Sequence, residues 1–145
     1  MKRVDMVLSA LNPQGLGLEI GPCHNAVAPK HHGFNVDIVD HLSQEGLVEK
    51  YGDHSSVDVS KIEPVDFVWE GGSYADLTGK RNYYDWVIAS HVVEHVPDLV
   101  QFINSCDEVL KDDGVLSLVI PDKRFCFDRF RAISSLDKAI DSHHQ

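Results

Sequence analysis

A glycine directly follows the first apolar run of the sequence, and an acidic residue ends the second. The first run, residues 16–20, stops at Gly21-Pro22, and the second, residues 34–40, closes on Asp40. A glycine lets a ligand approach the backbone closely, and a carboxylate about 20 residues later is the position that binds a ribose diol in nucleotide-binding α/β proteins. The two residues therefore favour a nucleoside-containing cofactor. A turn glycine and a helix N-cap at Asp40 are the alternative interpretation.

The glycine spacing also bears on which cofactor fits. A nicotinamide-dependent dehydrogenase would share the acidic residue, but it needs G-x-G-x-x-G at the start of a helix to hold a pyrophosphate. Here Gly15 and Gly17 precede or lie within the first run, and the next glycine after Gly21 is Gly33. The pattern indicates a cofactor without phosphates, and a dehydrogenase stays as a further alternative.

Nine histidines raise the question of a metal site. His91 and His95 have the i, i+4 spacing of the H-E-x-x-H zinc motif, but the glutamate, Glu94, is displaced and no third ligand is evident. The adjacent pairs 31–32 and 143–144 point in different directions on a strand or a helix. We expect no metal.

Strand-length apolar runs alternate with helical patterns along the chain. Hydrophobic periodicity and turn residues predict strands at 16–20, 34–40, 65–70, 84–90 and 115–120. Helices are predicted at 5–11, 42–51, 96–110 and 124–140, the last from the core-like spacing of Phe127, Phe130, Ile133, Leu136 and Ile140. This alternation implies right-handed crossovers and an α/β, doubly wound, mainly parallel sheet, with ligands bound beyond the carboxyl ends of the strands.

Length and composition restrict the remaining possibilities. The chain has 145 residues and a formal net charge of −10, from 13 Lys+Arg and 23 Asp+Glu. The length suits a single domain, residues 1–145, and the acidic balance argues against nucleic-acid binding. No apolar run reaches the roughly 20 residues of a membrane span. Three cysteines, an odd number without a C-x-x-C pair, indicate reduced thiols and a cytoplasmic location.

Three segments together resemble the class I S-adenosylmethionine-dependent methyltransferases. Residues 18–22 read L-E-I-G-P, like the first motif of that class, and residues 84–98 resemble its fourth strand with the E-H-V pattern that follows. Residues 108–116 resemble the approach to its fifth strand. With Pro121-Asp122-Lys123-Arg124, the chain is most similar to methyltransferase-11-like bacterial proteins. The resemblance implies a Rossmann-like sheet in the order 3-2-1-4-5.

The resemblance also assigns roles to the residues at the first two strand ends. It implies that Glu19, Ile20, Gly21 and Pro22 lie against the methionine part of S-adenosylmethionine. Asp40 would take the ribose hydroxyls. Cys23 stands where the family often has glycine, a small-for-small change that we expect to be tolerated.

The third and fourth strand ends would complete the cofactor site. The adenine would lie in the loop after the third strand, where Gly72, Ser73 and Tyr74, or Asp76, stand in place of the family's glycine and acid. Ser90 and His91 would pass behind the methionine and the sulfonium.

Two histidines lie beside the expected region of methyl transfer. His91 and His95 could act as a general base at near-neutral pH. A base is needed only if the acceptor must lose a proton, because the sulfonium already makes the methyl group electrophilic. The alternative is that Glu94 and His95 orient the loop or cap the following helix. An active chain would methylate a small-molecule acceptor and release S-adenosylhomocysteine.

The chain is short for this resemblance. A complete class I sheet has seven strands, and the sequence accounts for five, so we expect an incomplete domain that lacks the sixth and seventh strands. The alternative function is a noncatalytic or fragmentary domain that binds a nucleoside or a partner. The fifth strand would be an exposed edge, which favours association. We therefore expect a homodimer contact at that edge, or cover from the C-terminal helix.

Overall fold

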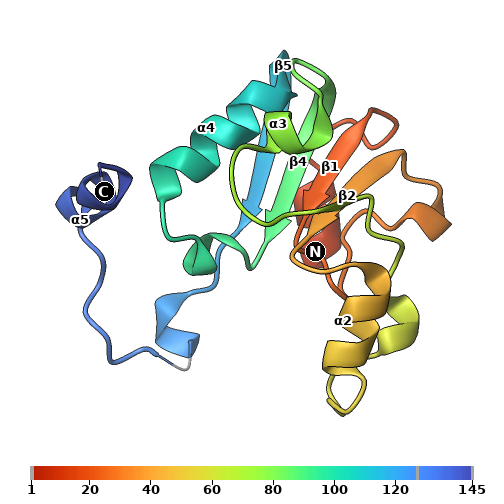
Figure 1. Ribbon diagram of the computed structural model, residues 1–145, viewed down its shortest axis with the longest axis horizontal. Helices are drawn as coiled ribbons and strands as arrows, with labels where there is room; N and C mark the ends of the chain where they lie inside the picture. The colour runs from red at the N-terminus through yellow and green to blue at the C-terminus, as the bar shows by residue number, and fades with distance from the viewer. Residues whose placement is uncertain (1, 127, 145) are drawn as a thin grey trace.

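Five parallel strands in the order β3-β2-β1-β4-β5 form the centre of the computed structural model (Figure 1). The structure describes residues 2–126 and 128–144. The strands are β1 (Gly17–Ile20), β2 (Val36–Asp40), β3 (Phe67–Val68), β4 (Tyr84–Ser90) and β5 (Leu110–Val119). The expected α/β sheet and its strand order are confirmed.

The third strand is much shorter than the predicted run of residues 65–70. Only Phe67 and Val68 pair with β2, and the Trp69 N–H then donates to the Asp40 carbonyl at 2.8 Å. β3 is an edge strand whose Val68 is exposed, so it has little apolar surface to bury. Its short length brings the following loop directly to the end of β2.

The helices mostly follow the predicted ones with shifted ends. They are α1 (Arg3–Leu8), α2 (Gln44–Tyr51), α3 (Tyr74–Thr78), α4 (Leu99–Val109) and α5 (Leu136–His143). α4 begins later than predicted because the Asp98 side chain accepts a hydrogen bond from the Gln101 N–H, which fixes the N-cap there. The short α3 was not predicted, and Ser73 caps it by accepting from the Asp76 N–H.

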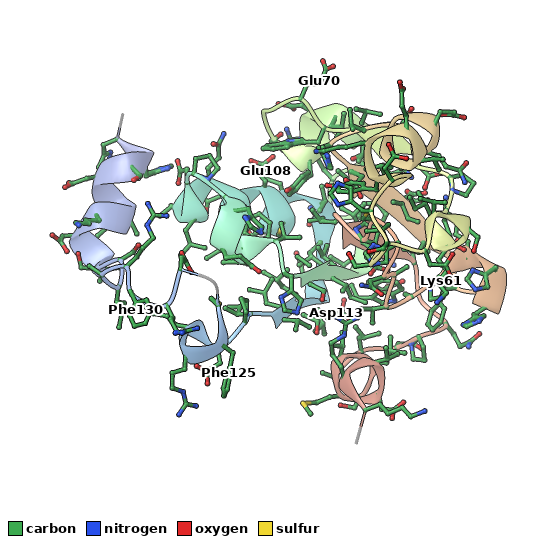
Figure 2. The ribbon with its side chains drawn as sticks, turned by 90° about the horizontal axis from the view of Figure 1, so that it is seen from below. Lys61, Glu70, Glu108, Asp113, Phe125 and Phe130 are labelled. Atoms are coloured by element: carbon green, nitrogen blue, oxygen red, sulfur yellow. The ribbon has the colours of Figure 1, made fainter. Side chains whose placement is uncertain are left out.

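The two faces of the sheet carry separate apolar clusters. Leu18 and Ile20 of β1 pack with α3 and α4 on one face. Trp86 and Ile88 of β4 pack with α1 and the loop that follows β1 on the other. Figure 2 shows α1 on one side of the sheet and α3 and α4 on the opposite side. The sheet is thus covered on both faces, as a parallel sheet requires.

Gly17 and Trp86 lie side by side in the middle of the sheet. They are partners in the β1–β4 register, and the Trp86 side chain is fully buried. A Cβ added at Gly17 would lie 2.0 Å from the indole ring. The absence of a side chain at Gly17 is therefore what allows the indole to lie over β1.

The predicted helix at 124–140 is wrong for most of its length. The structure has a 3-10 turn at Lys123–Phe125 and a helix only from Leu136. The supposed core positions Phe130, Ile133 and Leu136 are 88%, 79% and 77% exposed, Ile140 is 43% exposed, and Phe127 lies outside the described residues. Helices of this length are stable in water mainly when one face packs against the rest of the protein. The apolar side chains of this segment do not pack against the sheet, so most of the predicted helix does not form.

The C-terminal helix packs on α4 and not on the outer strand. Figure 1 shows α5 beside the amino-terminal end of α4, apart from β5, and His143 Nδ1 lies 2.9 Å from Asp98 Oδ2. The expectation that this helix covers the β5 edge is therefore wrong. Residues Val115–Val119 of β5 are only partly buried. None of the described helices is both long and apolar enough to cross a membrane.

Candidate functional site

A cavity of about 450 Å³ opens at the carboxyl ends of β1, β2 and β4. The sequence-predicted residues that line it are Ile20, Gly21, Asp40, Tyr74, His91 and His95. Glu19, Pro22, Gly72, Ser73 and Ser90 are not among its lining residues. Parallel strands bring their carboxyl ends to the same edge of a sheet, which explains why residues far apart in the sequence meet here.

Glu19 lies beside the cavity but points to the opposite face of the sheet. Its side chain is 1% exposed, and its carboxylate accepts hydrogen bonds from the N–H groups of Val27 at 2.7 Å and Ala28 at 3.0 Å. Burial raises the pKa of Glu19, although the two backbone donors oppose that shift. Glu19 thus holds the loop after β1 in place.

The loop after β1 turns through left-handed backbone at two positions. Gly21 has φ +62° and donates its N–H to the Val39 carbonyl at 2.8 Å. Cys23 has φ +46°, a conformation that favours glycine. The structure therefore gives a second physical reason for a glycine at position 23, besides small size. Burial, followed by the nearby Asp40 carboxylate, raises the pKa of the Cys23 thiol.

Asp40 forms a chain of polar contacts along one side of the cavity. One carboxylate oxygen, Oδ2, accepts from the Cys23 N–H at 3.1 Å. The other, Oδ1, accepts from the His41 N–H at 2.8 Å and lies 2.7 Å from the ring nitrogen Nδ1 of His41. Lys50 Nζ, from α2, lies 2.9 Å from His41 Nε2. His41 and Lys50 both line the cavity, and sequence reasoning missed both. His41 could have been noticed because it directly follows Asp40.

Aromatic side chains form the wall on the β3 side. Trp69 directly follows β3, and its ring centroid lies 6.2 Å from that of Tyr74. The Trp69 Nε1–H donates to the Gly72 carbonyl at 3.0 Å, so it fixes the glycine loop. Burial raises the pKa of Tyr74 above its ordinary value. Of the residues predicted for the adenine, Tyr74 reaches the main cavity, Gly72 lines a small neighbouring crevice, Ser73 caps α3, and Asp76 lines neither hollow.

The end of β4 supplies the fourth side. His91 has φ +58°, and its N–H donates to the Val119 carbonyl at 2.9 Å. Its Nδ1 lies 3.4 Å from Glu94 Oε1, while His95 follows on a 3-10 turn. Ser90 Oγ is buried without a hydrogen-bond partner. His91 and His95 both line the cavity, whereas Ser90 has the same parity in β4 as Trp86 and Ile88, which pack on the opposite face of the sheet.

Metal-ligating side chains do not gather in this part of the chain. Among the residues that the structure describes, no group of three or more His, Cys, Asp or Glu side chains is arranged to hold a metal ion.

Residues 18–118 match the family model described as "Methyltransferase domain". The chain belongs to this family. The matched residues begin in β1 and end in β5, so they include every strand that borders the cavity. A comparison with curated proteins finds no match.

Solved structures similar to this methyltransferase domain share its fold. A chain from Galdieria sulphuraria assigned as a sarcosine dimethylglycine methyltransferase is 20% identical, with a TM-score of 0.52, over 79% of this chain and 45% of that one. The methyltransferase CalH in complex with SAH (S-adenosylhomocysteine) is 19% identical, with a TM-score of 0.53, over 79% and 34%. A SAM-dependent methyltransferase from Thermotoga maritima is 19% identical, with a TM-score of 0.56, over 97% and 67%. This methyltransferase domain thus spans less than half of the length of the first two.

Proposed function

We propose that this methyltransferase domain binds S-adenosylmethionine in the cavity and transfers its methyl group to a small-molecule acceptor, releasing S-adenosylhomocysteine. The observation that carries the proposal is the meeting of Gly21 and Asp40 at one edge of the cavity. The presence of S-adenosylhomocysteine in the structure of CalH, which shares the fold, supports it. A nicotinamide dinucleotide fits less well, because the loop after β1 does not open a helix that could hold a pyrophosphate.

The residues around the cavity fit the three parts of such a cofactor. Asp40 would accept the ribose hydroxyls, and Trp69 and Tyr74 would contact the adenine in place of a carboxylate. The backbone of Ile20 and Gly21 would lie against the methionine, with Glu19 and Pro22 fixing that loop from behind. Ser90, the last residue of β4, does not line the cavity and would act on the methionine end only through His91, the residue that follows it.

The methyl group of a bound sulfonium is electrophilic without help from the protein. The chain's own task is to align the acceptor with the methyl group and to exclude water. His91 and His95 line the part of the cavity nearest the β4 end, and either ring would accept a proton from an acceptor that must lose one. Gly72 and Ser73 would shape the adenine end indirectly, through the loop that Trp69 fixes.

Calorimetric titration tests the cofactor proposal. We expect S-adenosylhomocysteine to bind the wild-type chain and NAD not to bind. Asp40→Ala is expected to weaken S-adenosylhomocysteine binding by about 10- to 100-fold, because hydrogen bonds to a charged group contribute roughly 1.5–3 kcal/mol. Asp107→Ala, an exposed change on α4, is the matched control and should bind as the wild type does. Failure of the wild-type chain to bind S-adenosylhomocysteine would contradict the proposal.

We also propose that two copies pair through the outer edge of β5 and that the protein works in the cytoplasm. The edge supports the first idea, since Val115–Val119 are partly exposed and α5 does not cover them. All three cysteines are free thiols, which supports the second. Sedimentation velocity should show a dimer that dissociates on dilution. A separate hydrogen-exchange measurement should show slower amide exchange in β5 in the dimer than in the monomer. A monomer at every concentration would refute the pairing.

A further inference from the structure

The carboxylate of Asp40 is nearly saturated with hydrogen bonds from its own chain. One oxygen, Oδ1, accepts from the backbone N–H of His41 and lies 2.7 Å from the His41 ring, while Oδ2 accepts from the Cys23 N–H. A carboxylate offers about four lone-pair positions in all. Three are used, and the side chain is only 2% exposed. A ribose diol needs two positions, so one internal donor must leave before the diol can bind.

Only one of the three donors is free to leave. The backbone N–H groups of Cys23 and His41 are fixed, the first in the tight loop after β1 and the second at the end of β2. The His41 ring is on a rotatable side chain that is 44% exposed. Rotation about its χ angles removes it from Asp40 without moving the backbone.

Lys50 keeps the His41 ring in its place. Its ammonium group carries only donors, so at 2.9 Å it donates to His41 Nε2. The ring proton is then on Nδ1, where it points at Asp40 Oδ1. Lys50 thus selects the tautomer that occupies Asp40, although Lys50 does not contact the carboxylate itself.

We propose that the His41 ring is an internal competitor for Asp40, held by Lys50 and displaced when the ribose of a nucleoside binds. The inference rests on the proposed function, because it takes Asp40 as the ribose acceptor. In the free protein, His41 and Lys50 together supply a hydrogen bond to the buried carboxylate of Asp40. The same pair lowers the affinity for the cofactor, because the ring must leave before the ribose binds. Leaving that carboxylate short of partners would cost stability.

Binding measurements on three variants test the competition. His41→Phe keeps a ring but removes the donor, and it is expected to bind S-adenosylhomocysteine about tenfold more tightly, the equivalent of about 1.4 kcal/mol. Lys50→Met is expected to bind about threefold more tightly. The double variant should match His41→Phe alone, because Lys50 acts through His41. Both positions are exposed, and thermal melts would verify that each variant is folded.

A ligand without the diol separates competition from other effects of the ring. The 2′,3′-dideoxy analogue of S-adenosylhomocysteine should bind wild type and His41→Phe equally. Weaker binding of S-adenosylhomocysteine to His41→Phe, or an equal gain for both ligands, would overturn the proposal, since the ring would then support the nucleoside or simply oppose any ligand. If neither wild type nor His41→Phe binds S-adenosylhomocysteine, the proposed function fails and the competition falls with it. Binding by wild type without the expected gain refutes the competition alone.

Discussion

Alanine at position 17 is expected to destabilise the fold by about 3 kcal/mol or more, the upper part of the range for overpacked cores. The added Cβ would lie 2.0 Å from the ring of Trp86, which is fully buried on the neighbouring strand. Neither group can move easily, because Gly17 is paired on both sides, with Val36 of β2 and Trp86 of β4. Urea denaturation monitored by circular dichroism would measure the loss of unfolding free energy.

A double-mutant cycle shows whether the clash is the cause. Trp86→Phe alone should destabilise the chain through the lost burial, but the combination with Gly17→Ala should cost less than the sum of the two single changes. Gly46→Ala is the comparison within a helix: a Cβ at Gly46 of α2 would lie 3.2 Å from the Leu42 Cβ, a tight contact but a far milder one than the 2.0 Å contact at Gly17, so a much smaller change than that of Gly17→Ala is expected. Wild-type stability in Gly17→Ala would show that the indole does not need that space.

Removal of the Glu19 side chain is expected to cost about 2–6 kcal/mol of unfolding free energy, because it leaves two buried backbone donors without partners at about 1–3 kcal/mol each. The donors are the N–H groups of Val27 and Ala28, whose residues are almost completely buried. The same denaturation measurement applies to Glu19→Ala. The loop that these donors anchor includes Cys23, so binding at the cavity should weaken as well.

Glu70→Ala is the matched control for Glu19. Figure 2 shows Glu70 reaching out into solvent beyond the sheet, and its residue is exposed. An exposed change of this kind usually alters stability by less than about 0.5 kcal/mol. Equal stability losses for Glu19→Ala and Glu70→Ala would show that the loop does not depend on the buried carboxylate.

The sheet and one side of the cavity followed from the sequence because they depend on short-range patterns. Apolar runs that end in glycine or an acid marked the ends of β1 and β2, and parallel strands necessarily bring such ends together. Gly21 and Asp40 accordingly line the cavity. The direction of Glu19 could also have been read, since it alternates with Leu18 and Ile20 and must point to the other face.

The missed parts of the site depend on long-range packing. Lys50 reaches the cavity only because α2 returns its last turn to the end of β2, and Trp69 does so because β3 stops after two residues. The sequence around α2 and β3 contains no motif or periodicity that predicts either arrangement. The helix predicted at 124–140 failed for the opposite reason: its periodicity was present, but the surface to pack against was not.

The positions of the two tryptophans make the chain suitable for optical measurements. The sequence has two indoles, and they lie in different environments. Trp86 is enclosed in the apolar layer beneath α1, so its emission should be blue-shifted and should change only when the sheet is disrupted. Trp69 is partly exposed on the cavity wall, so quenching of its redder emission would follow ligand occupancy. Unlabelled protein thus provides separate fluorescence signals for unfolding and for binding.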